Sequence, residues 1–253
     1  MLIRRPILIN LMYMLIMFAV CMIFLIVFER NILLYRLCYV PVVVDELIMA
    51  FYNILLNSGQ DDNTDGLERV FIQWNYSFFF PTITLCNHVT NWRKQSLKFR
   101  TDVAMMGKLG YDLVVSKLNE NELKFSQQVL RDYARLKSII WHGRLFRLVS
   151  PYRLNRDIAS LLYVNEERDQ AVWFTYLVGN RYLAGSNGVI RLKGLDPLKK
   201  YQIQEINIYP GTDQSTVISV QSISGDYLMT YGFNPVVDVQ RPSVVLQLTN
   251  VTN

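Results

Sequence analysis

An acidic cluster directly before an amphipathic stretch offers the carboxylates that acid–base chemistry needs. Asp61, Asp62 and Asp65 lie within five positions, and from Leu67 onward apolar residues recur at spacings of three, four and seven. That spacing predicts one face of a helix, and an aspartate ahead of it can accept hydrogen bonds from the first turn. Two roles stay open for these carboxylates: a helix cap, or a general acid at the mouth of a barrel.

A histidine among polar residues is the second candidate for a functional role. Residues 82–86 alternate as in a strand, and Asn87, His88 and Thr90 come at its predicted carboxyl end. Ligands bind at the carboxyl ends of the strands in a (β/α) barrel, so His88 is a candidate for contact with substrate. The alternative is a structural hydrogen bond. The three cysteines have no Cys-x-x-Cys spacing, so they predict neither a zinc site nor a disulfide framework.

Several segments, taken in chain order, resemble the α-galactosidases of glycoside hydrolase family 36. The acid/base segment of that family reads Ser-Asp-Asn-Thr-Asp, then Glu-Arg and Ile-Gln. Asp61 replaces the serine here, and the matching positions are Asp62-Asn63-Thr64-Asp65, Glu68-Arg69 and Ile72-Gln73. Further similar segments are 87–90, 101–113, 191–197, 205–207 and 224–229. The resemblance extends from Asp61 to Leu248.

The resemblance implies a retaining glycosidase that hydrolyses terminal α-D-galactosides such as those of the raffinose series, without a metal or organic cofactor. One carboxylate of such an enzyme protonates the leaving oxygen and a second attacks the anomeric carbon. The alignment makes Asp62 the acid/base and assigns His88 to the sugar site. The family nucleophile is the aspartate of a Lys-Trp-Asp strand end, and no Trp-Asp pair occurs in this sequence. We therefore expect these 253 residues to be inactive alone.

The predicted fold is α/β plus all-β, in three parts. Residues 1–30 contain an apolar run at 7–28 that is long enough for a bilayer-spanning helix. It is either a membrane anchor or a stretch supplied by a stray upstream reading frame of a truncated gene. Residues 31–142 are predicted to be the C-terminal portion of a (β/α)8 barrel, and residues 143–253 an antiparallel β-sandwich. The sandwich is long enough to fold independently.

Two expectations concern the end of the barrel portion. Asn119 and Glu122 have capping-box spacing and are predicted to begin a long helix. Residues 101–113 are predicted to form the last barrel strand and its loop, with Asp102 and Asp112 as loop carboxylates.

In the sandwich, Trp173 and Tyr176 are expected in the core rather than in a sugar-binding platform. Strands are predicted at 145–149, 159–164, 171–177, 189–192, 201–206, 227–230 and 244–248.

The net charge excludes one class of partner, and three functional hypotheses remain. The net charge of +5 is spread along the chain without a basic run, so no nucleic-acid partner is expected. The first hypothesis is an inactive α-galactosidase fragment. The second is half of an enzyme, completed by another chain with the missing strands. The third hypothesis is a membrane-anchored β-sandwich for interaction or carbohydrate binding. Localisation is at a membrane if residues 7–28 span one, and otherwise cytoplasmic or periplasmic.

Overall fold

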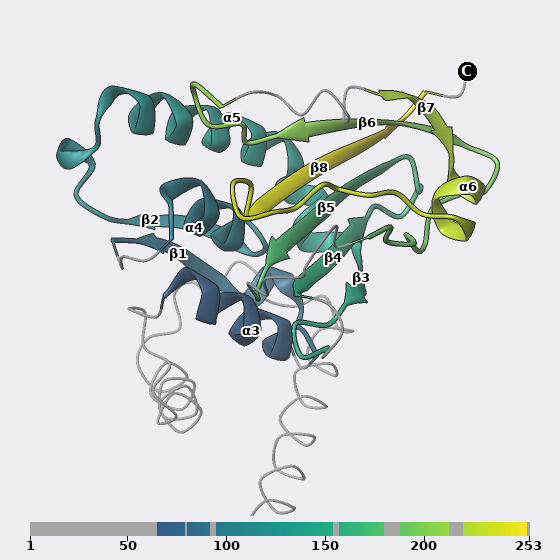
Figure 1. Cartoon of the computed structure of the whole chain (residues 1–253), viewed down its shortest axis with the longest axis horizontal. Helices are drawn as coiled ribbons and strands as arrows, with labels where there is room; N and C mark the ends of the chain where they lie inside the picture. Colours follow the sequence, from purple (N-terminus) through teal and green to yellow (C-terminus); the bar gives the residue numbers. More distant parts are fainter. Residues whose placement is uncertain are drawn as a thin grey trace, which may run out of the picture. The chain divides into compact units, whose positions relative to one another are not determined.

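A computed structural model describes residues 65–78, 80–91, 95–153, 157–179, 188–212 and 220–251 of the chain (Figure 1). All of them belong to one compact unit, Gln60–Asn253. Asp62 and the predicted apolar helix at 7–28 lie outside the described residues. Within the described ranges, no helix is both long and apolar enough to cross a bilayer.

The first half of this unit contains a β–α–β arrangement followed by a long helix. Strands β1 and β2 pair in parallel, from Cys86 opposite Lys108 to Thr90 opposite Asp112, and α4 makes the crossover between them. Such a crossover is what joins parallel strands. The elements are α3 (Gly66–Tyr76), η1 (Thr82–Thr84), β1 (Cys86–Thr90), α4 (Leu97–Ala104), β2 (Lys108–Asp112), η2 (Val115–Lys117) and α5 (Glu120–His142).

Two predicted barrel strands are displaced from their observed positions. Residues 82–84 form a short 3-10 helix, so the strand starts only at Cys86 and His88 lies inside it rather than after it. Residues 101–104 form the end of helix α4, which Ser96 caps at its N-terminus, and the strand follows at 108–112. In the second segment Val103 to Met106 are all buried, and an apolar run that is buried all round has neither helical nor strand periodicity, so its type is ambiguous from sequence.

The helix caps were predicted correctly from local spacing. Asp65 caps α3 by accepting a hydrogen bond from the backbone nitrogen of Leu67 at 2.9 Å. Asn119 and Glu122 form the capping box of α5, with bonds of 3.0 and 2.9 Å. The cap role of the acidic cluster is therefore shown for Asp65.

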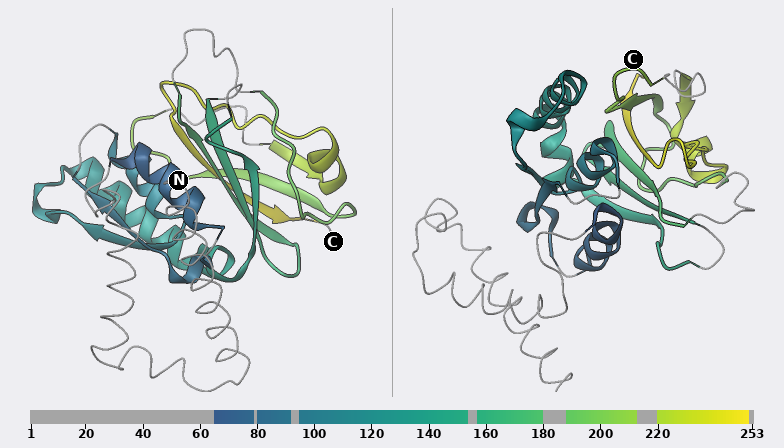
Figure 2. Two further views of the ribbon diagram at one scale, coloured as in Figure 1. Left: turned by 90° about the horizontal axis from the view of Figure 1, so that it is seen from below. Right: turned by 60° about the vertical axis from the view of Figure 1, so that its left-hand side comes forward.

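The second half is a six-stranded antiparallel sheet in the order β3-β4-β5-β8-β6-β7 (Figure 2). Strand β8, the last in the chain, lies between β5 and β6, so it is at the centre of the sheet. The elements are β3 (Arg144–Val149), β4 (Ile158–Val164), β5 (Gln170–Leu177), β6 (Lys200–Ile206), β7 (Val220–Ser224), α6 (Gly225–Thr230) and β8 (Ser243–Asn250).

The described residues contain one sheet in this half rather than the predicted two-sheet sandwich. The strand predicted at 227–230 is helix α6, the one at 189–192 makes only an isolated bridge between Ile190 and Phe233, and β7 was not predicted. Instead of a second sheet, α6 and extended segments cover the outer face. The buried residues of these covering segments pack in one cluster with side chains on the outer face of the sheet. The covering segments contribute Ile190, Leu192, Leu195, Leu228 and Val237, and the sheet contributes Trp173, Leu246 and Leu248.

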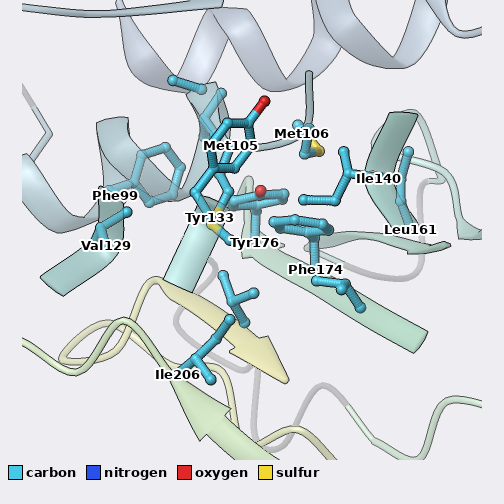
Figure 3. Close-up of a cluster of buried hydrophobic side chains, with 14 of the residues drawn as sticks. Phe99, Met105, Met106, Val129, Tyr133, Ile140, Leu161, Phe174, Tyr176 and Ile206 are labelled. Carbon is cyan, nitrogen blue, oxygen red and sulfur yellow. The ribbon is translucent and has the colours of Figure 1, made fainter. Parts of the chain in front are cut away.

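The inner face of the sheet shares one hydrophobic core with α3, α4 and α5 (Figure 3). Trp173 and Tyr176 are fully buried, on the outer and inner faces respectively, which confirms that they are core residues. The shared core crosses the predicted domain boundary at 142/143. Its members from the sheet include Leu161, Tyr163, Phe174, Tyr176, Ile206 and Val245, and those from the helices include Val70, Phe99, Val103, Val129, Leu136 and Ile140.

Buried tyrosines tie the α4–β2 connection to the surrounding elements. Tyr176 donates to the backbone oxygen of Asp102 at 2.8 Å, Tyr163 to that of Met106 at 3.0 Å, and Tyr133 to that of Gly107 at 2.6 Å. Carbonyls at a helix end have no partner in the helix and need one when buried. Burial raises the pKa of Tyr163 to about 12 and that of Tyr176 well above its usual value, so both hydroxyls keep the proton they donate.

Asp102 is a buried helix residue that accepts several hydrogen bonds, and not the loop carboxylate that was predicted. It lies in α4 with no exposed surface and accepts hydrogen bonds from Lys98 at 2.5 Å, Ser243 at 2.6 Å and Asn207 at 2.9 Å. Lys98 also donates to the backbone oxygen of Ser243 at 3.0 Å. One carboxylate therefore joins the crossover helix to two separate segments of the sheet half.

Candidate functional site

The pairing of β1 and β2 creates one polar face. Val89 of β1 and Leu109 and Tyr111 of β2 pack in the core that contains the helices. Successive strand residues point to opposite faces, so the residues that alternate with these three lie on the other face. They include the register pairs His88–Gly110 and Thr90–Asp112. Thr90 and Asp112 are the last residues of their strands, at the carboxyl edge where barrel enzymes bind ligands.

Gly110 makes room for the imidazole of His88. A Cβ atom at position 110 would lie 2.7 Å from Cδ2 of His88, closer than real side chains approach. The His88 side chain is partly buried in mid-strand, and its ring nitrogens can donate to and accept from sugar hydroxyls. The structure thus brings His88 together with Thr90 and Asp112 on one face. Asp62, the predicted acid/base, is outside the described residues.

Asp112 is a candidate that the sequence reasoning missed. It was expected in a loop, but it ends β2 as an exposed carboxylate opposite Thr90. The sequence contained the pattern that predicts this strand, because the apolar residues Leu109 and Tyr111 alternate with Lys108, Gly110 and Asp112. An exposed carboxylate at a strand end can accept hydrogen bonds from substrate hydroxyls.

Two arginines from the helices hold the backbone of β1. Arg69 of α3 donates from Nη1 to the backbone oxygen of His88 at 3.4 Å, and Arg100 of α4 donates to that of Thr90. Burial lowers the pKa of Arg100, and the charges of Glu122 and Asp65 act in the opposite direction. A guanidinium is protonated in proteins regardless of such shifts. The helices therefore position the strand that carries His88.

Replacing Gly110 with alanine is expected to destabilise the protein by about 1–3 kcal/mol, because the new methyl group overpacks against His88. The cost should largely disappear in a His88→Ala background, which gives a coupling energy of about 1 kcal/mol or more in urea unfolding. Gly107→Ala is the matched control, because its Cβ would meet Asn87 and the Leu85 carbonyl instead. An equal cost of Gly110→Ala in both backgrounds would contradict the contact.

Comparison with known families covers both halves of the chain. Residues 14–143 match the family Melibiase, and residues 158–248 match the Glycosyl hydrolase family 36 C-terminal domain. The first match begins inside the apolar run at 7–28, so part of that run belongs to the segment that the family describes.

Relatives and solved structures agree with these matches. α-Galactosidase AgaA of Geobacillus stearothermophilus is 33% identical over 161 residues, which are 60% of this chain and 21% of the relative. α-Galactosidase 1 of Pediococcus pentosaceus is 28% identical over 196 residues, 75% of this chain and 24% of the relative. The crystal structure of family 36 α-galactosidase AgaB from G. stearothermophilus superposes with a TM-score of 0.64 and 29% identity, covering 76% of this chain and 25% of AgaB.

Some of the similar structures contain bound sugars. Substituted forms of AgaA were crystallised with raffinose and with stachyose. This chain spans about a quarter of the length of the relatives it matches. The matched families, the relatives and the fold all agree: the chain belongs to the melibiase family and corresponds to the C-terminal part of a family 36 α-galactosidase.

Proposed function

We propose that this chain supplies the C-terminal part of a catalytic unit that hydrolyses terminal α-D-galactosides with retention of configuration. The observation that carries the proposal is the parallel β1–α4–β2 unit, whose polar face carries the partly buried His88 and the exposed Asp112 beside the buried Thr90. It lies within the segment that matches the melibiase family. The substrate class is α-galactoside oligosaccharides of the raffinose and stachyose kind, by analogy with the ligands of AgaA.

Each candidate residue has a defined part in the double displacement. Asp62 donates its proton to the glycosidic oxygen as the bond to the anomeric carbon breaks and the nucleophile attacks that carbon. Asp62 then takes a proton from water, which attacks the same carbon and releases the sugar and the nucleophilic carboxylate. His88 binds a sugar hydroxyl beside this centre, with Asp112 as a second polar contact at the strand ends.

The nucleophile and the remaining strands come from outside the described residues in this proposal. No Trp-Asp pair exists in the sequence, and the described residues supply two parallel strands of a barrel that has eight. Val114 and Val115, just beyond the carboxyl end of β2, are 49% and 56% exposed. Apolar side chains at that position fit a surface that the rest of a barrel covers. Under this proposal the 253 residues alone are inactive, and turnover requires the upstream strands and the nucleophile.

The test is hydrolysis of an aryl α-galactoside by the full chain, alone and co-expressed with the upstream portion of AgaA. We expect no turnover alone and measurable turnover in the combination. Asp62→Asn should lower the turnover of the combination by about 10²–10⁴-fold, the usual contribution of a general acid. The configuration of the first product, followed by NMR, should be retained.

Each outcome has a distinct meaning. Turnover by the chain alone contradicts the absence of a nucleophile. Turnover that Asp62→Asn leaves intact contradicts the acid/base role. If a stable complex forms but never turns over, the chain is not an enzyme half, and the membrane-anchored interaction or carbohydrate-binding alternative is favoured. Carbonate extraction of membranes tests the anchor at residues 7–28 separately.

A further inference from the structure

Helix α6 and its C-cap residue present a pair of exposed tyrosines on the surface of the sheet half. Tyr227 and Tyr231 are 49% and 66% exposed, their ring centroids are 5.1 Å apart and their planes are inclined by 34°. Neither hydroxyl has a hydrogen-bond partner among the described residues. The two rings therefore pack against each other and still leave about half or more of each side chain, with its hydroxyl, open to solvent.

The helix that carries the pair is firmly attached to the sheet. The Ser224 side chain caps it by accepting from the backbone nitrogen of Tyr227 at 3.2 Å, and Gly225 donates to the backbone oxygen of Lys199 at 2.8 Å. Leu228, which lies between the two tyrosines in the sequence, is fully buried. Its backbone oxygen accepts a hydrogen bond from the backbone nitrogen of Leu192 at 3.0 Å. A rigid element that exposes aromatic rings loses little conformational entropy on binding a ligand.

The chemistry of this surface fits a sugar ring. Asp226 and Thr230 lie one position before the two tyrosines, so a polar stripe runs beside the aromatic stripe on the short helix. A hexose presents C–H groups on a ring face and hydroxyls around its rim, which suit an aromatic ring and a neighbouring carboxylate. We propose that Tyr227 and Tyr231 form a non-catalytic platform that binds glycosyl units of α-galactoside oligosaccharides.

The size of the surface favours a sugar over a protein partner. Two tyrosines with about half to two thirds of their surface exposed offer roughly 250 Å². A stable protein interface buries about 800 Å² on each partner. A platform of this size matches one or two sugar rings, and a second copy of the chain would need a much larger complementary area.

The choice of α-galactosides as ligand class depends on the proposed function, whereas the platform itself does not. The experiment is therefore a binding titration that needs neither turnover nor a nucleophile. Stachyose is titrated by calorimetry into the full chain, into the Tyr227→Ala/Tyr231→Ala variant, into one control and into a variant of the candidate barrel site. The control Tyr152→Ala removes a tyrosine of similar exposure, 55%, elsewhere on the surface, whereas His88→Ala reports any stachyose bound at the candidate sugar site of the barrel.

Saturable binding with a dissociation constant in the millimolar range is expected, at least about tenfold weaker in the double variant and unchanged in Tyr152→Ala. Circular dichroism should show that all variants are folded. Binding that the double variant retains, or that His88→Ala abolishes, would overturn the platform. Absence of saturable binding would do the same. A lower oligomeric state of the double variant in sedimentation would show instead that the tyrosines join two copies of the chain.

Discussion

Replacement of Asp102 by alanine is expected to lower the free energy of unfolding by about 3–5 kcal/mol, the usual cost of removing one partner of a buried ion pair. The carboxylate has no exposed surface and receives hydrogen bonds from Lys98, Ser243 and Asn207. Alanine would leave an ammonium, a hydroxyl and an amide without that acceptor in a buried site. Urea unfolding followed by circular dichroism measures the loss.

Two controls separate the buried charge from ordinary surface effects. Lys124→Ala removes one partner of an exposed pair with Glu120 and should cost well below 1 kcal/mol. The double variant Lys98→Met/Asp102→Leu removes both charges and should recover part of the loss, because a buried pair is often replaceable by apolar residues of similar volume. A cost below about 1 kcal/mol for Asp102→Ala would show that the network contributes little to stability.

The sheet half alone, residues 143–253, is expected to lack a cooperative unfolding transition. Separation from the helices would expose the inner face that shares their core, which includes Leu161, Phe174, Tyr176, Ile206 and Val245. Re-exposing each large apolar side chain costs about 1.5–3 kcal/mol. The sum reaches the whole stability of a typical domain, about 5–15 kcal/mol. The length of this segment had suggested independent folding, and the shared core leads to the opposite expectation.

Urea unfolding of residues 143–253 and of residues 60–253 tests this expectation side by side. The longer segment should unfold in one sharp transition, while the shorter one should aggregate or lose signal gradually. Tyr163 and Tyr176 would also lose the carbonyls of Met106 and Asp102 that accept their hydroxyl hydrogens. Equal midpoints for the two segments would establish the sheet half as an independent domain.

Local patterns in the sequence determined the elements whose stability is local. Caps and helical spacing located α3 and α5, because Asp65 and the Asn119–Glu122 box bond to backbone within three residues. Short strand-like runs separated by turn residues located five of the six sheet strands, and only β7 was not predicted. The motifs from Asp61 onward were enough to recognise the family, which the comparisons confirm.

Tertiary structure decided the features that depend on partners far along the chain. Val103 to Met106 are all buried, so no periodicity separated the end of α4 from a strand. The partners of Asp102 at positions 207 and 243 are 105 and 141 residues away, beyond any local pattern. The polar face that joins His88 to Asp112 likewise exists only through the register of two parallel strands. A sequence specifies which residues are polar, and the fold decides which of them meet.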